Sequence, residues 1–237
     1  MTGDDTDALA GLVRVHQQLV RGNDGFAGGA VLYPEPRRPA TDWRPTFRHE
    51  AYRAADPSTL GLGGTESFHD LADEAVEAAI LKVVDVEGPV HFRVLAERLL
   101  TAADVGRLGS RIRGRIADRI DELEKEEAVV QRGDYVGRPD HIRAPVVRDR
   151  RAIRDKLRDL DYVPEVEIMQ ALFQAVLDAE GVSVDDAMSR CLDLLGFERL
   201  TDNARDRLRP ALSALVEREM LRQEDGRLWL ARDAFVR

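Results

Sequence analysis

Arginines recur at helical spacing in one short part of this 237-residue chain. The segment 107–119 contains five arginines, and three of them, Arg111, Arg115 and Arg119, are four residues apart. Positions four apart lie above one another on an α-helix, so we expect these guanidinium groups on one flank of it. A guanidinium binds phosphate oxygens strongly, often through two parallel hydrogen bonds. The spacing therefore predicts a helix that contacts the phosphate backbone of a nucleic acid.

The predicted contacts extend beyond that flank. Ser110 is expected to cap the helix and, with the free amides of the first turn, to bind an anion. The small side chains of Gly114 and Ala117 would allow a backbone to approach closely. The predicted nucleic-acid contacts in this part of the chain are Arg107, Ser110, Arg111, Arg113, Arg115, Arg119 and Arg132. A secondary set, at corresponding positions later in the chain, is Asn203, Arg205 and Arg207.

An alternative interpretation of the same arginines stays open. Their stems can lie over the core while the charged ends pair with Asp118, Glu122 or Glu126 of the same helix. Asp118 and Asp121 are expected toward the outer face, where their charge would repel phosphates. Such repulsion would weaken sequence-specific reading more than loose binding to the backbone.

Other kinds of chemistry are not indicated, and we expect neither an enzyme nor a cofactor. The glycines of GLGGTES, from Gly61, lack the lysine and the preceding strand of a phosphate loop. The five histidines form no recognisable site, and His91 is expected to be a partly buried structural residue. Cys191, the only cysteine, is expected to be buried in a helix. No nucleophile or cluster of metal ligands stands out.

Two parts of the chain repeat one another. VVDVEGPVHFRVLAERLL, from Val83, aligns with VLDAEGVSVDDAMSRCLDLL, from Val176, and the apolar positions that follow mostly coincide. A repeat of this length indicates duplicated small domains. Each copy is expected to run helix, short strand, helix, turn, helix and hairpin, which is the order of a winged helix-turn-helix domain. We therefore expect a mainly α fold with small β wings, made of two tandem winged helix-turn-helix domains.

The two copies are not expected to be equivalent. Pro210 falls inside the third helix of the second copy, where a proline removes a hydrogen bond and would kink or restart the helix. This copy is therefore expected to support structure or protein contacts. The expected organisation is an amphipathic helix in 1–30, a proline- and glycine-rich arm or linker in 31–66, the first winged helix in 67–140, a charged connector in 141–160 and the second winged helix in 161–232.

The phrases VEGPVH and LAERLL in the first copy and EIMQALFQAVLDAEG with LLGFERL in the second together resemble a bacterial domain of unknown function. In that family the domain lies at the C-terminal end of very large proteins that combine a superfamily-one helicase core with a nuclease-like domain of the very-short-patch-repair type. The resemblance covers roughly residues 48–232. It implies that the chain is similar to the detached tail of such a protein, standing alone or as one subunit of a split system.

The composition limits the kinds of partner that the chain can have. The net charge of −9 argues against a protein whose whole surface coats nucleic acid, although it permits a local basic patch. No apolar run approaches the roughly 18 to 20 residues that span a membrane, and the first residues lack a secretory signal. We therefore expect a cytoplasmic protein with no membrane partner.

Two functions follow from these observations. The first is a non-catalytic accessory module of a helicase- or nuclease-type system, which binds the DNA backbone through the third helix of the first copy. The alternative is a protein-protein interaction scaffold with no direct nucleic-acid contact, whose N-terminal helix and arm dock on a larger helicase- or nuclease-like partner.

Overall fold

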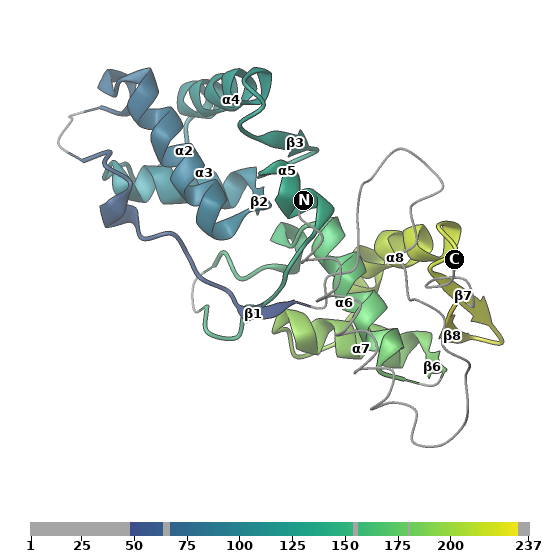
Figure 1. Cartoon of the computed structure of the whole chain (residues 1–237). Coiled ribbons are helices and arrows are strands. Elements are labelled where there is room, and N and C mark those ends of the chain that lie inside the picture. Colours follow the sequence, from purple (N-terminus) through teal and green to yellow (C-terminus); the bar gives the residue numbers. More distant parts are fainter. Residues whose placement is uncertain (1–47, 64–66, 154–155, 180, 232–237) are drawn as a thin grey trace. The chain divides into compact units, whose positions relative to one another are not determined.

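The computed structural model describes residues 48–63, 67–153, 156–179 and 181–231 (Figure 1). The amphipathic helix expected in 1–30 and the arm up to residue 47 lie outside the described residues. Within them the chain forms two compact units. The first-repeat unit comprises residues 50–143 and 150–164, and the second-repeat unit comprises residues 48–49, 144–149 and 165–231.

The first-repeat unit is built on three helices and a small antiparallel sheet. Its principal elements are α2 (Asp73–Glu87), β2 (Val90–His91), α3 (Phe92–Ala102), α4 (Ser110–Lys125), β3 (Val130–Arg132) and β4 (Tyr135–Gly137). The strand order is β2-β4-β3, so the short strand between α2 and α3 pairs with the second strand of the hairpin. Shorter elements surround this set, namely β1 (His49–Ala51, whose first residue belongs to the other unit), η1 (Pro57–Thr59), η2 (Phe68–Asp70), α5 (Pro139–Arg143) and η3 (Leu160–Tyr162).

The core of this unit lies between α2, α3 and α4. Ile80 and Val83 of α2 are fully buried, as are Ile116 and Ile120 of α4. These positions recur every three or four residues, which is the spacing that places apolar side chains on one face of a helix. The segment before α2 adds to the same core, where Leu62 is almost completely buried. The described end of the predicted arm is therefore part of the first-repeat unit.

The second-repeat unit repeats this order of elements. It contains α6 (Glu165–Leu177), β6 (Val182–Ser183), α7 (Val184–Leu195), α8 (Asp202–Glu217), β7 (Leu221–Glu224) and β8 (Arg227–Leu230), together with β5 (Val147–Asp149). The strand order β6-β8-β7 matches that of the first sheet. Asp225 and Gly226 both have positive φ in the hairpin turn, as the sequence Asp-Gly predicts for a type I′ turn.

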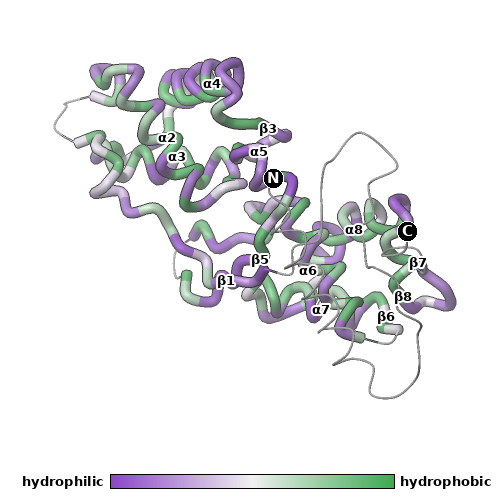
Figure 2. The backbone as a smooth tube through the Cα atoms, in the orientation of Figure 1, coloured by the Kyte–Doolittle hydropathy of each residue, from purple (hydrophilic) through white to green (hydrophobic). Residues whose placement is uncertain are grey.

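The described residues thus form a mixed α/β fold that is mostly helical, with seven α-helices and small sheets. The helices differ in how far they are enclosed. α4 is largely hydrophilic in Figure 2, with hydrophobic residues at intervals, whereas nearly every residue of α6 from Glu167 to Leu177 is buried. Because α6 packs against α7, α8 and β5, it is enclosed on several sides.

The prediction that the helix restarts at Pro210 was wrong. α8 runs without interruption from Asp202 to Glu217 with Pro210 inside it. Pro210 and the residue four before it, Asp206, are both exposed, so the carbonyl that loses its amide partner faces solvent. On the opposite face Leu208 and Ala211 are fully buried. Burial of that face holds the helix together through the position of the proline.

Candidate nucleic-acid interface

The helix that carries the predicted interface, α4, is held in place by its apolar stripe. Ile116, Ile120 and Leu123 are buried, and Ile112 extends the stripe toward the first turn. This stripe packs against α2. The arginines that flank it therefore lie either beside α2 or on the exposed side of α4, and the structure separates them into two groups.

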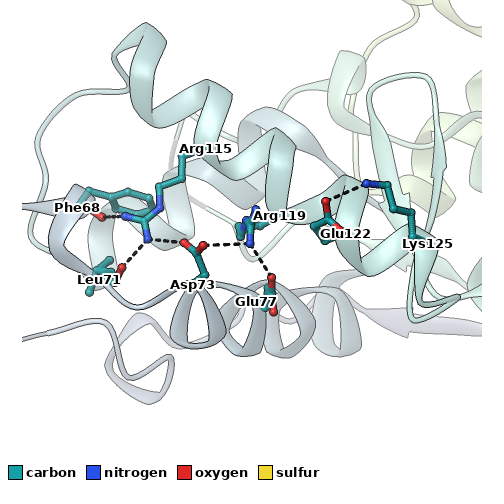
Figure 3. A network of polar contacts seen from close by, with 8 residues as sticks. All are labelled: Phe68, Leu71, Asp73, Glu77, Arg115, Arg119, Glu122 and Lys125. Carbon is teal, nitrogen blue, oxygen red and sulfur yellow. Dashed lines mark hydrogen bonds and ion pairs between the residues drawn. The ribbon is translucent and has the colours of Figure 1, made fainter.

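Arg115 belongs to the group that lies beside α2, and it is engaged within the unit. Its guanidinium donates to the carbonyl of Phe68 at 2.7 Å, to the carbonyl of Leu71, and to the Asp73 carboxylate at 2.7 Å (Figure 3). The three acceptors lie in the turn that leads into α2 and in the first residue of that helix. Arg115 thus fastens the start of α2 to α4.

Arg119, one turn further along α4, is also paired with α2. One of its terminal nitrogens, Nη1, lies 3.1 Å from the Asp73 carboxylate and 3.3 Å from the Glu77 carboxylate (Figure 3). The hydrogen bond from Arg115, and less strongly the charges of both arginines, lower the pKa of Asp73 although some desolvation opposes the shift. The side chains of Arg115 and Arg119 are mostly shielded from solvent, with 17% and 22% of their surface exposed.

Internal pairing of the arginines therefore occurs, but with other partners than the sequence suggested. The expected acceptors were Asp118, Glu122 and Glu126 on α4 itself. Glu122 is instead bonded by Lys125 at 2.8 Å, which lowers the pKa of Glu122 and raises that of Lys125.

The second group of arginines lies at the exposed start of α4. Arg107 and Arg111 are exposed, and neither forms a hydrogen bond or ion pair with the residues that the structure describes. Arg113 is also exposed and places its guanidinium 4.9 Å from the ring centroid of Phe92, the first residue of α3. Three of the predicted contacts therefore remain available to a ligand in one short segment.

The prediction that Ser110 caps α4 was wrong. The N-cap is Gly109, in an extended conformation, and no side chain caps the helix. Ser110 is the first helical residue and is exposed. The first amides of a helix lack intrahelical acceptors, and here no acidic residue occurs in the first turn. The space around the start of α4 is also open, because no atom lies within 4 Å of where a Cβ would stand on Gly106, Gly109 or Gly114.

Arg132 does not join this group. The Gln131 amide beside it donates to the Glu124 carboxylate at 2.8 Å, which places β3 at the end of α4 away from Arg111. Thirteen residues of helix separate Arg111 from Glu124, or roughly 20 Å at 1.5 Å per residue. The predicted set is thus divided between the two ends of α4, and exposed acidic residues lie between them and beyond, namely Asp118, Asp121, Glu124 and Glu126.

The secondary set in α8 is less available. Arg205 pairs with Asp185 at 2.9 Å and with Asp202 at 3.4 Å. The hydrogen bond between Arg205 and Asp185 raises the pKa of the guanidinium and lowers that of the carboxyl. Asn203 is exposed and Arg207 is half-buried. The arginine that corresponds to Arg113 is therefore neutralised in the second repeat.

A buried polar cluster in the first-repeat unit escaped sequence reasoning. Glu87, the last residue of α2, is 1% exposed, and its carboxylate accepts from the Ala55 amide and from Arg98 Nε, both at 2.8 Å, and from the hydroxyl of Tyr52. Burial and the Glu87 charge raise the pKa of Tyr52 well above its ordinary value. The donors come from two parts of the chain, residues 52–55 and Arg98 in α3, and no local motif connects them to Glu87. The cluster fastens residues 52–55 to the repeat.

His91 has the structural place that the sequence indicated. Its ring nitrogen accepts from the Arg93 amide at 3.0 Å and so caps α3. The ring lies edge-on to Tyr135 and close to Tyr162. Cys191 is fully buried, and burial raises the pKa of its thiol.

The described residues contain no group of three or more His, Cys, Asp or Glu side chains arranged to hold a metal ion. None of the helices in the described part of the chain is long and apolar enough to cross a membrane.

The chain was compared with protein families, curated proteins and solved structures. No curated protein and no solved structure matches the chain. Residues 66–114 match the model of a family described as a protein of unknown function, DUF3320. The matched segment contains α2, β2, α3 and the start of α4, so it includes Arg107, which precedes α4, and Arg111 in the first turn of α4. This agrees with the domain of unknown function that the sequence led us to expect.

Proposed function

We propose that the chain consists of two tandem winged helix-turn-helix domains and that the first of them binds the phosphate backbone of DNA. Support for this fold comes from the shared element order and from the two antiparallel sheets, β2-β4-β3 and β6-β8-β7. In each, a short strand between the first two helices pairs with the outgoing strand of a hairpin that follows the third helix. A winged helix commonly places its third helix, here α4, against DNA.

The observation that carries the proposed activity is the cluster of exposed arginines at the start of α4. Arg107 and Arg111 make no ion pair with the described residues, and Arg113 has its guanidinium exposed beside an aromatic ring. They lie around the N-terminus of α4, where no side chain caps the first amides and no acidic residue occurs in the first turn. The glycines there leave open space in which a phosphate backbone can approach. Arginines and main-chain amides are the usual ligands of DNA phosphates.

The proposed contact is with the backbone and not with the edges of the bases. A helix that reads the major groove needs donors and acceptors along its outer face, and Asp118 and Asp121 are exposed on α4. These carboxylates would face the phosphates on either side of the groove. Contact through the first turn alone keeps the duplex away from them.

We further propose that this binding makes the chain a non-catalytic accessory of a helicase- or nuclease-type system. That association rests on the sequence resemblance, in which similar domains close large helicase- and nuclease-like proteins. The accessory role is to hold or position the nucleic acid for such a partner.

The test is fluorescence anisotropy of labelled duplex DNA titrated with the protein at several salt concentrations. Arg107→Ala/Arg111→Ala should weaken binding and reduce the slope of log affinity against log salt by about two, one for each lost phosphate contact. The control, Arg143→Ala/Arg209→Ala, removes the same number of positive charges from two arginines, one partly and one largely exposed, that pair with carboxylates of their own helices. Equal effects of both variants, or no binding by the unmodified protein, would reject the proposed interface.

A second candidate function, a protein-interaction scaffold, is favoured by a groove in the second-repeat unit. The groove has a volume of about 510 Å³ and lies between the start of α7, the outer side of α8 and β7. Its apolar lining residues are Val184, Met188, Leu212 and Val216, with Arg209 and Glu217 among the charged ones. A photo-crosslinking residue at Ser213, in this groove, should then capture a protein that the same residue at Ser189, exposed on α7 and not among the groove residues, does not capture.

A further inference from the structure

We propose that Asp73 and Glu77 are intramolecular competitors that keep Arg119 from the phosphates of a bound nucleic acid. This inference rests on the proposed function, because it concerns regulation of the same DNA contact. Two carboxylates of α2 occupy a guanidinium of α4 that lies on the flank of Arg111. The contact limits the interface to the first turn of α4 and thereby lowers its affinity for DNA.

Arg115 and Arg119 differ in what they hold. Arg115 donates to the main-chain carbonyls of Phe68 and Leu71, so it is required for the path of the chain into α2. In the described part of the chain, Arg119 donates to the carboxylates of Asp73 and Glu77 alone. Its release would therefore leave the main-chain anchors intact, and ion pairs with partly exposed groups contribute little to stability.

The geometry of this ion pair suits exchange with a phosphate. The Asp73 side chain is 50% exposed and that of Glu77 is 23% exposed, so both carboxylates are accessible from solvent. A guanidinium binds carboxylate and phosphate oxygens in the same way, through charge-assisted hydrogen bonds. Arg119 is eight residues from Arg111, about 12 Å along the helix, so a backbone in contact with Arg111 can continue toward Arg119.

The carboxylates act on binding in two ways. They neutralise Arg119, and their negative charge repels any phosphate that approaches this side of α4. Both effects are removed when the charges of Asp73 and Glu77 are removed. The amide variants Asp73→Asn and Glu77→Gln keep the size of each side chain. Asp73→Asn also weakens the contact with Arg115, but Arg115 keeps its bonds to the carbonyls of Phe68 and Leu71, so the packing of α2 on α4 is retained.

The experiment compares four proteins by anisotropy with labelled duplex DNA over a range of salt. These are the unmodified protein, Asp73→Asn/Glu77→Gln, Arg119→Ala, and the variant that combines all three substitutions. The amide pair should tighten binding about threefold to tenfold at low salt and steepen the salt slope by about one, as one added phosphate contact would. Arg119→Ala alone should change affinity less than about twofold, but it should abolish the gain of the amide pair.

A control separates release of Arg119 from the change in net charge. Asp85→Asn/Asp140→Asn removes two carboxylates from the same unit, each of which pairs with a different arginine. It should tighten binding less than the amide pair does, and Arg119→Ala should not reverse its effect. Circular dichroism and thermal unfolding of each variant establish that the fold is kept.

The outcomes distinguish the two proposals. If binding depends on Arg107 and Arg111 but is unchanged by Asp73→Asn/Glu77→Gln, the proposed competition by these carboxylates is rejected and the proposed DNA interface is retained. The proposed competition is also overturned if Arg119→Ala alone weakens binding by much more than about twofold, because Arg119 would then already contact DNA in the unmodified protein. If the unmodified protein and the amide pair both fail to bind, the proposed function itself is rejected, and the competitor with it.

Discussion

Arg113 lies over the ring of Phe92, whereas at the corresponding positions of the second repeat Arg205 pairs with Asp185. The contact between the third helix of a repeat and the start of its second helix is thus a cation-π interaction in the first repeat and an ion pair in the second. The cation-π contact leaves the charge of Arg113 uncompensated and exposed, while Arg205 is neutralised. The first repeat thus keeps an exposed, uncompensated arginine at a position where the second repeat has a paired one, which supports the proposal that the first repeat binds phosphate.

Replacement of Phe92 by leucine tests the cation-π contact. The variant keeps an apolar side chain at the start of α3 but removes the ring, so the free energy of unfolding should fall by about 0.5–1 kcal/mol. Urea unfolding of Phe92→Leu, Arg113→Gln and the double variant measures the coupling between the two residues. Additive effects of the two single substitutions would show that the contact contributes nothing to stability.

Arg115→Ala is expected to destabilise the protein more than Arg119→Ala. Loss of Arg115 leaves the carbonyls of Phe68 and Leu71 without their charged donor, at a cost of about 1.5–3 kcal/mol in the free energy of unfolding. Loss of Arg119 removes an ion pair with partly exposed carboxylates, which contributes about 0–1 kcal/mol. Thermal and urea unfolding of the two variants, with Arg115→Lys as a partial replacement, give the ranking. The reverse ranking would contradict the conclusion that Arg115 anchors the start of α2 whereas Arg119 does not.

Glu87 should be among the most sensitive positions of the first-repeat unit. Removal of its buried carboxylate takes away the ion-pair partner that accepts from Arg98 Nε, and breaking a buried ion pair costs about 3–5 kcal/mol. Glu87→Ala should therefore lower the urea midpoint strongly and increase cleavage by trypsin after Arg53. Because the cost comes from the uncompensated charge, Glu87→Ala/Arg98→Leu should be more stable than Glu87→Ala alone. No recovery in the double variant would mean that the carboxylate acts through Tyr52 and Ala55 instead.

The buried stripe of α4, at Ile116, Ile120 and Leu123, and the turn at Asp225 and Gly226 can both be predicted from the sequence alone. Both depend on local periodicity or turn chemistry, which a window of a few residues contains. The order of helices, short strands and hairpin in each repeat follows from the same local signals.

The partners of the arginines could not be predicted, for a physical reason. Asp73 is 42 residues from Arg115 and 46 from Arg119, and their contact depends on how α2 packs against α4. Periodicity placed the arginines on one flank but gave no information on the element that covers it. The cluster around Glu87 escaped for the same reason, since its donors are 35, 32 and 11 residues away. Pro210 shows the opposite error, in which a local rule was outweighed by burial of the helix face.

Stability toward acid should depend on Asp73. The hydrogen bond from Arg115 lowers the pKa of this carboxyl in the folded protein, so its ionised form is favoured by folding. A lowered folded pKa gives stability that is present above the ordinary pKa, about 4 for an aspartate, and is lost as the pH falls through the folded value. Asp73→Asn should therefore destabilise the protein at pH 7 and have a smaller effect near pH 2. Urea midpoints at the two pH values measure this, and an equal effect at both would exclude the linkage.

Cys191 offers a probe of the second-repeat unit that needs no substitution. The thiol is fully buried in α7, and burial raises its pKa, so both access and thiolate formation are suppressed in the folded state. A thiol reagent such as Ellman's reagent should modify it only when this unit opens, at a rate that rises with urea. Arg205→Ala removes the ion pair with Asp185, which lies in α7 as Cys191 does, and should therefore accelerate modification. Arg115→Ala, in the first-repeat unit, should not accelerate it if the two units open independently. Rapid modification of the native protein at pH 8 would contradict the burial of the thiol, and equal acceleration by the two variants would show that the units unfold together.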